Sequence, residues 1–250
     1  HESMQLCVSC KGCRRECPTG VDMAKMKIEF LHHYHSRHGV PARERLIAEL
    51  PRYAPWLSRV SGLANLRNRS RLLKNLGHRV LGLSAERQLP HWAGHSFSNT
   101  VSEAGENRNG ELVLFADTFN RYFDPDVLRA AVKVLTKAGY RVHLPGVKGG
   151  EARPLCCGRT YLASGMMQRA KEEAQRTLDA LQPYLEAGMP VVGLEPSCLF
   201  TFQDEFASLL AGETVARLAD QTQMFEQFLL GEGYEGFSEL EWVPAPGQKA

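Results

Sequence analysis

The chain has 250 residues, of which 43% are hydrophobic and 23% are charged, and its net charge is +2. This composition is ordinary for a folded globular protein and excludes a disordered or fibrous one. No run approaches the ~18 consecutive apolar residues that span a bilayer. The stretch from Cys7 to Cys17 stands where the apolar core of a signal peptide would lie. Because seven cysteines is an odd number, which argues against a disulfide scaffold, we expect a cytoplasmic protein that uses thiols for metal or redox chemistry.

The charge is unevenly distributed between the two parts of the chain. Residues 1–90 hold 16 Lys and Arg against 7 Asp and Glu, whereas residues 91–250 hold 14 against 21. Such asymmetry indicates a nucleic-acid or membrane partner, or a basic domain that docks on an acidic neighbour. The basic residues of segment 43–74 are evenly spaced and have no interleaved aromatic residues, which favours a solvated helix surface. We therefore expect no nucleic-acid partner and at most peripheral contact with the inner face of a membrane.

The first predicted element is a cysteine-rich loop over residues 1–20. Cys7, Cys10, Cys13 and Cys17 follow the spacing C-x2-C-x2-C-x3-C-P, which is typical of bacterial iron–sulfur proteins. A cluster presents several iron atoms a few ångströms apart, so a loop around it supplies a thiolate every three residues. Structural zinc is the alternative, but zinc ribbons usually separate two cysteine pairs by about 12 or more residues. The spacing predicts a [4Fe-4S] cluster, with Cys17 as its fourth ligand or as a ligand of a neighbouring cluster.

Helices are expected to follow this loop as far as a linker. The first covers residues 22–37, with Thr19 and Asp22 resembling a capping box. Shorter helices are expected over residues 42–49, 53–60 and 62–75, punctuated by prolines and a glycine. Residues 84–110 are rich in Ser, Gly and Asn and are interpreted as a linker. The histidines near the end of the first helix are interpreted as solvated: His32, His33, His35 and His38.

From Glu111 onward, short apolar runs alternate with helical patterns. Strands are expected over residues 112–116, 140–144 and 190–194, and helices over residues 126–138, 164–187, 198–211 and 214–230. Strands that alternate with helices form βαβ units around a parallel sheet. The sequence therefore predicts an α+β protein, in which an α-helical N-terminal part precedes an α/β part with a mostly parallel sheet.

The motifs together resemble those of a known group of flavoenzymes. Residues 6–24 resemble the iron–sulfur segment of FAD-linked D-2-hydroxyglutarate, D-lactate and glycolate dehydrogenases. Residues 155–159 (LCCGR) and 193–198 (GLEPSC) resemble the cysteine-rich CCG domain of this group, which heterodisulfide reductase subunits also carry. Residues 115–123 (FADTFNRYF) are similar too. These matches fall in order along nearly the whole chain and look most like the long single-chain type linked to D-2-hydroxyglutarate.

The resemblance implies a part of a larger oxidoreductase. It implies an α-helical, ferredoxin-like [4Fe-4S] segment over residues 1–95, a linker over 96–110, and the first half of a CCG domain over 111–250. An FAD domain is expected upstream of His1, in the same full-length chain or in a partner subunit. The implied electron acceptor is a quinone or a carrier protein. The isolated fragment is then expected to be inactive toward hydroxy acids.

A second metal site is expected where Cys156, Cys157, Cys198 and Asp117 meet. Cys198 follows a predicted strand and is expected to open a helix capped by Ser197, where the helix dipole stabilises a thiolate. Asp117 and Cys198 both come just after strands, and open α/β sheets bind ligands at the carboxyl ends of their strands. This soft ligand set suits zinc or an iron–sulfur cluster. Free cysteines that are merely small buried residues are the alternative.

Three functions are compatible with these motifs. The leading hypothesis is an iron–sulfur electron-transfer module of an FAD-dependent 2-hydroxy-acid dehydrogenase, which relays electrons from flavin to an acceptor. An alternative is a heterodisulfide-reductase-like subunit with a catalytic CCG site. The resemblance places further cysteines where this chain has Thr118 and Thr201, which counts against that alternative. The third is a zinc-stabilised interaction domain without a redox role.

Overall fold

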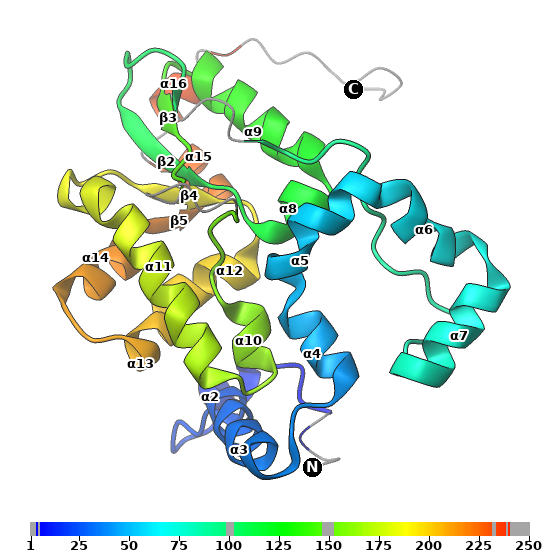
Figure 1. Cartoon of the computed structure of the whole chain (residues 1–250). Helices are drawn as coiled ribbons and strands as arrows, with labels where there is room; N and C mark the ends of the chain where they lie inside the picture. Colours follow the sequence, from blue (N-terminus) through cyan, green and yellow to red (C-terminus); the bar gives the residue numbers. More distant parts are fainter. Residues whose placement is uncertain are drawn as a thin grey trace.

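The computed structural model describes residues 4, 6–98, 103–146, 153–231, 234–238 and 240. It is a mixed α/β protein with a five-stranded, mostly parallel sheet, which confirms the predicted fold class. Figure 1 shows the sheet in the upper part of the molecule, α3 at the bottom, and α6 with α7 projecting to one side. The ferredoxin-like character of the N-terminal helices and the boundaries of the two predicted domains stay predictions.

The sheet has the strand order β1-β3-β2-β4-β5. The pairs β3–β2, β2–β4 and β4–β5 are parallel, and β1 runs antiparallel to β3 at one edge. The three predicted strands are present, but both edge strands were missed because two or three residues show no recognisable alternation. In particular, β5 interrupts the helix that was expected over residues 214–230. The strands are β1 (Glu103–Ala104), β2 (Glu111–Phe115), β3 (Arg141–His143), β4 (Val191–Gly193) and β5 (Thr222–Met224).

Helices cover both faces of the sheet, because β2 is apolar on both sides. Val113 and Phe115 point into one core, whereas Leu112 and Leu114 point into the other, as the two-residue period of a strand requires. The helices of the first face are α10 (Arg159–Ala163), α11 (Met167–Glu186), α12 (Pro196–Phe200), the π-helical turn η2 (Thr201–Glu205), α13 (Phe206–Leu209) and α14 (Glu213–Gln221). The helices of the second face are α9 (Pro125–Lys137), α15 (Phe225–Leu230) and α16 (Tyr234–Ser238).

The described part of the N-terminal region consists of helices and loops. The last two helices, Ser61–Arg69 and Arg71–Leu81, are separated at Ser70, and the Ser70 hydroxyl caps the second of these helices. Pro51 lies in the first turn of its helix, where its missing N–H costs nothing, and Pro55 lies inside the same helix. The elements are α2 (Gly12–Glu16), α3 (Met23–His38), α4 (Ala42–Ala48), α5 (Leu50–Leu57), η1 (Ser58–Val60), α6 (Ser61–Arg69) and α7 (Arg71–Leu81).

Helix α3 packs tightly against the turn between α10 and α11. Its N-terminus is capped by Asp22 itself, which accepts from the N–H groups of residues 24 and 25, so the expected capping box from Thr19 is wrong. His35 is buried, and its Nδ1 lies 3.0 Å from the carbonyl oxygen of Ser164. The interpretation of all four histidines as solvated is therefore wrong for His35. Ser164 lies 129 positions from His35 in the sequence, so the periodicity of α3 does not reveal this contact.

A third small core joins the N-terminal helices to the α/β part. Ala54, Trp92 and Tyr122 form this core, and the Asn65 side chain makes two 2.9 Å hydrogen bonds with the backbone of Trp92. The linker expected over 96–110 falls partly outside the described residues, and its described part includes the edge strand β1. No helix in the described ranges is both long and apolar enough to cross a membrane. Helix α8 (Thr118–Tyr122) follows β2 in the chain.

Candidate functional site

The strand order reverses between β2 and β4, because the chain adds β3 on one side of β2 and β4 on the other. Candidate site residues lie at this point. The loops that follow β2 and β4 diverge at this reversal and leave a crevice at their carboxyl ends. Asp117 follows β2, and Glu195 and Cys198 follow β4. The fold thus brings two of the predicted site residues to the place where parallel sheets bind ligands.

The three cysteines of the α/β part meet in the core. The Sγ atoms of Cys157 and Cys198 are 3.0 Å apart, and the Cys156 thiol is hydrogen-bonded to Cys157. All three are buried and none is in a disulfide. The predicted convergence of these thiols across 41 residues is confirmed. Whether they bind a metal stays a prediction.

Hydrogen bonding and burial raise the pKa values of these thiols. The hydrogen bond with Cys157 and then burial raise the pKa of Cys156 well above its ordinary value. Although its hydrogen bond with Cys157 opposes the effect, burial raises the pKa of Cys198, with the nearby carboxylates of Asp117 and Glu195 acting in the same direction. Because metals bind the thiolate form, loading this site with a metal would release protons.

Side chains of α11 fix the loop that carries Cys156 and Cys157. The Thr177 hydroxyl donates to the carbonyl oxygen of Cys156 at 2.8 Å. The Arg176 guanidinium donates to the carbonyl oxygens of residues 153 and 154, and the buried Glu173 pairs with it. Gly158 then adopts a φ of 78°, a left-handed conformation that lets the chain turn into α10 directly after the two thiols. The loop is thus held on both sides of the thiol pair.

The two carboxylates at this crevice are helix caps. Asp117 accepts from the N–H groups of Phe119 and Asn120 and from the Asn120 side chain, so its oxygens are occupied by α8. Burial raises its pKa. Glu195, not the expected Ser197, caps α12, because its side chain accepts from both the backbone N–H and the hydroxyl of Ser197. Asp117 therefore orients α8, and its predicted role as a metal ligand stays untested.

The N-terminal cysteine loop has an unusual backbone. Ser9 and Lys11, which flank Cys10, both have a φ of 58°, a left-handed conformation that costs residues with a side chain about 1 kcal/mol each. Strain of this kind concentrates at functional sites. The N–H of Met23 points at the Cys13 Sγ at 3.4 Å, and Lys27 donates to the Cys7 carbonyl oxygen at 2.6 Å. The first two turns of α3 thus contact the loop at Cys13 and at Cys7.

The loop cysteines are chemically suited to an iron–sulfur cluster. All four are free, and they range from half-buried to exposed. A hydrogen bond with the Thr19 hydroxyl, followed by nearby backbone N–H groups, lowers the pKa of Cys17, which favours the thiolate. Within the part of the chain that the structure describes, no three Cys, His, Asp or Glu side chains converge on one ion position. A cluster does not require that convergence, because each thiolate binds a different iron atom.

An ion-pair network docks this loop on the helical segment that carries Cys198. Lys11 Nζ lies 2.5 Å from Asp204 and 2.8 Å from Glu205, and Arg14 and Lys25 pair with Asp204 at 3.1 and 3.0 Å. Glu205 also pairs with Arg159, two residues beyond Cys157. Asp204 and Glu205 lie in η2, which continues the helix that carries Cys198. One continuous helical segment therefore carries Cys198 and pairs with cations of the cysteine loop.

A cavity of about 630 Å³ lies between the cysteine loop and the α12–η2 segment. Cys10 and Lys11 line it on the loop side, and Glu195, Ser197 and Asp204 line it on the α12–η2 side. The sequence analysis missed Asp204 and Glu205, because nothing in their local pattern distinguishes them from other surface carboxylates. In the structure, both carboxylates lie in a π-helical turn, and π-helical turns are frequent at functional sites.

We expect Asp204→Asn to loosen the cysteine loop. Although partial burial opposes ionisation, hydrogen bonds from Lys11 and Lys25 lower the pKa of Asp204 to about 2. This carboxylate therefore contributes stability above its unfolded pKa of about 4, and that contribution is lost as the pH falls through about 2. Removing its charge should lower the free energy of unfolding at pH 7 by about 2 kcal/mol. Urea titrations at pH 7 and below pH 3 check this, because the difference between wild type and variant should shrink in acid.

A matched control separates this network from general charge effects. Asp126→Asn removes a carboxylate that pairs with Arg129 at 2.7 Å on an exposed surface. Such a pair contributes about 0–1 kcal/mol. If both variants change stability equally, the network around Asp204 does not hold the loop.

Known proteins match the chain over most of its length. The D-2-hydroxyglutarate dehydrogenase of Escherichia coli K12 is 29% identical over 224 residues, which cover 85% of this chain and 21% of that protein. The D-2-hydroxyglutarate dehydrogenase of Haemophilus influenzae is 26% identical over 220 residues, covering 83% of the chain and 21% of that protein. These dehydrogenases are homologues of the chain. They are oxidoreductases, as the resemblance of the motifs implied.

The similarity extends to a protein of another kind. One subunit of the anaerobic glycerol-3-phosphate dehydrogenase of Escherichia coli is 23% identical over 135 residues, which cover 52% of the chain and 33% of that protein. No protein-family profile and no solved structure matches the chain. The chain spans about a fifth of the length of the D-2-hydroxyglutarate dehydrogenases that it matches.

Proposed function

We propose that the chain is an iron–sulfur electron-transfer module of an FAD-dependent 2-hydroxy-acid dehydrogenase. Its partner is the FAD domain of that enzyme, and its acceptor is a quinone or a carrier protein. The observation that carries the proposal is the docking of the loop with Cys7, Cys10, Cys13 and Cys17 on the helical segment that carries Cys198. The similarity of the chain to D-2-hydroxyglutarate dehydrogenases supports this proposal.

The residues of the chain divide into ligands and groups that orient them. The four loop cysteines hold a [4Fe-4S] cluster, which when bound accepts and donates one electron at a time. Lys11 and Arg14 are cations directly beside these ligands, and Asp204 fixes where their charges lie. Because a nearby positive charge favours the more negative, reduced form of a cluster, these cations raise its reduction potential.

The buried thiols are the candidate ligands of a second site, for a soft metal, although in the described residues no three of the candidate ligands converge on one ion position. Cys157 and Cys198 present sulfur atoms 3.0 Å apart, and Cys156 lies against Cys157. Thiolates select zinc or iron–sulfur centres over hard cations. Thr118 and Thr201 leave this site with only three thiols, which weighs against a heterodisulfide-reductase-like catalytic role. Asp117 adjoins the site and orients α8 beside it.

An anaerobic preparation of the chain tests the proposal. We expect a brown protein with about four iron and four sulfide per loop site and a broad visible absorption that bleaches with dithionite. The same preparation, supplied with FAD and an artificial acceptor, should not turn over D-2-hydroxyglutarate, D-lactate or glycolate. A colourless protein that contains zinc alone would establish the interaction-domain alternative. Turnover of any of the three acids would place a substrate site within this chain.

A further inference from the structure

An arm of two helices, α6 and α7, projects from the body of the molecule (Figure 1). We call residues 61–81 the arm. It is attached firmly at its base, because the amide groups of Asn65 and Asn68 make paired hydrogen bonds with the backbone of residues 92 and 89. All residues of α7 are described and none is buried. A rigidly held helix with no buried face lacks a partner within the described structure.

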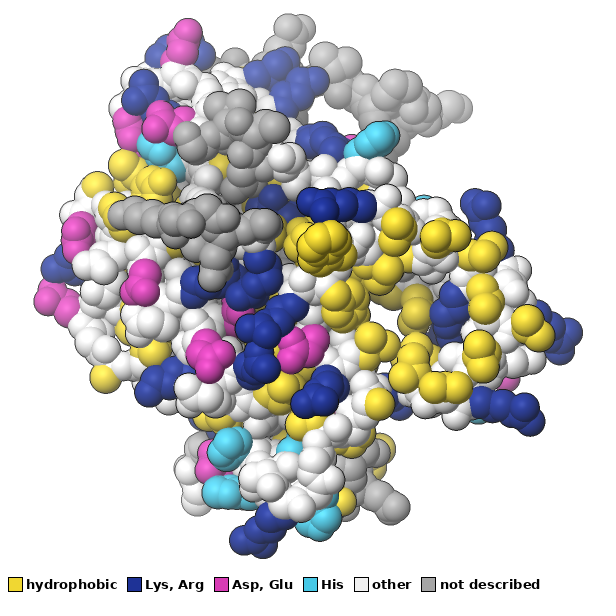
Figure 2. Space-filling view, in the orientation of Figure 1, with side chains coloured by type: hydrophobic (Ala, Val, Ile, Leu, Met, Phe, Trp, Pro, Cys, Tyr) yellow, Lys and Arg dark blue, Asp and Glu magenta, His cyan; other side chains and the backbone are white. Residues whose placement is uncertain are grey.

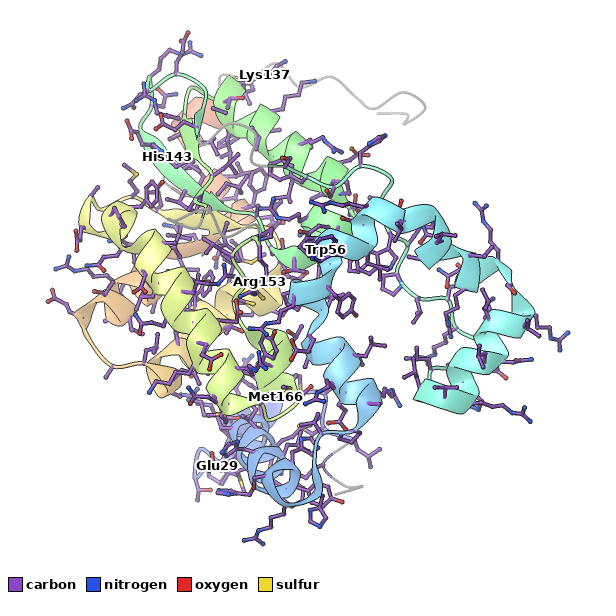
Figure 3. All side chains as sticks on the ribbon, viewed as in Figure 1. Glu29, Trp56, Lys137, His143, Arg153 and Met166 are labelled. Carbon is purple, nitrogen blue, oxygen red and sulfur yellow. The ribbon has the colours of Figure 1, made fainter. Side chains whose placement is uncertain are left out.

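The arm exposes large apolar side chains. Figure 2 shows hydrophobic side chains gathered over the arm on the face turned to the viewer, with Lys and Arg side chains around them. On α7, Leu72, Leu76 and Val80 recur every four residues and form one exposed stripe. Trp56, labelled in Figure 3, lies at the base of the arm and is 71% exposed. An exposed apolar patch of this extent with a polar rim marks an interaction surface. Its other members are Val60, Leu63 and Leu66.

The segment that carries this patch is rich in positive charge. Residues 50–85 contain seven Lys and Arg and no Asp or Glu. Within the described residues, the cations of α6 and α7 form no ion pair with a carboxylate. Arg59 stacks on the Trp56 ring, with its guanidinium carbon 4.9 Å from the ring centre. The patch therefore presents leucines and a tryptophan beside cations of α6 and α7 that pair with no carboxylate of the described residues.

We propose that the arm is a docking surface for an anionic lipid bilayer. A helix with a leucine stripe on one face and Lys or Arg on the other is the kind that lies in the headgroup region with its apolar side chains inserted. A bilayer with anionic lipids presents a continuous negative surface, which matches the five Lys and Arg side chains of α6 and α7. Protein interfaces, in contrast, are depleted in charge at their centre and mix both signs at their rim. The inference does not depend on the proposed function.

Docking of the arm on a bilayer would place its side chains at different depths in the membrane. Leu72, Leu76 and Val80 would enter the acyl boundary, and Trp56 would sit at the headgroup level, where its ring is favoured. Arg69, Arg71 and Arg79 are exposed and would meet the lipid phosphates. The cysteine loop lies on α3, apart from the arm (Figure 1), and so stays accessible in the docked state.

Vesicle sedimentation with the full chain tests this surface. Vesicles of equal parts phosphatidylglycerol and phosphatidylcholine should pellet the protein about tenfold more effectively than vesicles of phosphatidylcholine alone. The binding should weaken as added salt screens the lipid charge. The fluorescence of Trp56 should shift to shorter wavelength on the anionic vesicles, and Trp56→Phe should remove that shift.

Matched variants decide whether the arm is responsible. Leu72→Ser combined with Leu76→Ser should lower binding to anionic vesicles about tenfold while leaving the far-ultraviolet circular dichroism unchanged. Leu230→Ser on α15 is the control, because Leu72 and Leu230 are both 78% exposed. Wild-type protein that stays in the supernatant, or a double variant that pellets like wild type, overturns the proposal. A dimer that forms without vesicles and is lost in the double variant would assign the patch to a protein contact and also overturn it.

Discussion

Cys10→Ser is expected to abolish iron–sulfur loading at the N-terminal loop. Cys10 is exposed and lies between two residues in the left-handed conformation, Ser9 and Lys11, so the backbone strain is centred on this position. A serine hydroxyl is a harder and far weaker ligand for iron than a thiolate. We expect the iron and acid-labile sulfide of anaerobically purified protein to fall from about four per chain to near zero at this site, and the visible absorption to disappear.

Two variants serve as controls for that experiment. Val8→Ala changes an exposed side chain of the same loop without removing a thiol, so its iron content should equal that of wild type. Cys198→Ser removes a thiol of the buried site and should leave the loop chromophore in place. Iron and sulfide contents unchanged by Cys10→Ser would show that the loop does not bind a cluster, whatever its spacing.

Gly165→Ala is expected to be the most destabilising single change near the site. A Cβ atom there would lie 2.6 Å from the backbone nitrogen of His32 and the carbonyl carbon of Leu31, both in α3. Gly165 also has a φ of 66°, which disfavours any side chain. Because the opposing atoms are backbone, the strain is relieved only if α3 moves off the body. We expect the free energy of unfolding to fall by about 3 kcal/mol or more, measured by urea titration.

Gly188→Ala separates the effect of close packing from that of backbone conformation. Gly188 has a φ of 74°, but a Cβ atom there would meet nothing within 4 Å. Its replacement should therefore cost only about 1 kcal/mol. Equal losses in the two variants would mean that the contact between α3 and the α10–α11 turn contributes nothing beyond backbone strain. A further consequence of Gly165→Ala is faster loss of iron in air, because α3 carries the N–H that points at Cys13.

The amino-acid sequence by itself determined most elements and the candidate ligands. Helix α3, helix α9 and strands β2, β3 and β4 follow from periodicity and from Gly or Pro at their ends, which are local properties of the chain. The spacing of Cys7, Cys10, Cys13 and Cys17 is likewise local, so it predicts a set of cluster ligands without coordinates. The convergence of Cys156, Cys157 and Cys198 was also predictable, because the βαβ pattern brings the ends of parallel strands together.

Only the tertiary structure decided how the cysteine loop docks on the helical segment that carries Cys198. Asp204 lies 193 residues from Lys11, and no local pattern distinguishes it from an ordinary surface carboxylate. The burial of His35, the pairing of β5 and the capping of α12 by Glu195 likewise depend on contacts that form after the elements are packed. Periodicity reports the environment of a side chain averaged over its own element. An ion pair or a buried imidazole depends on one particular neighbour from a distant segment, and the sequence of its own element does not contain that information.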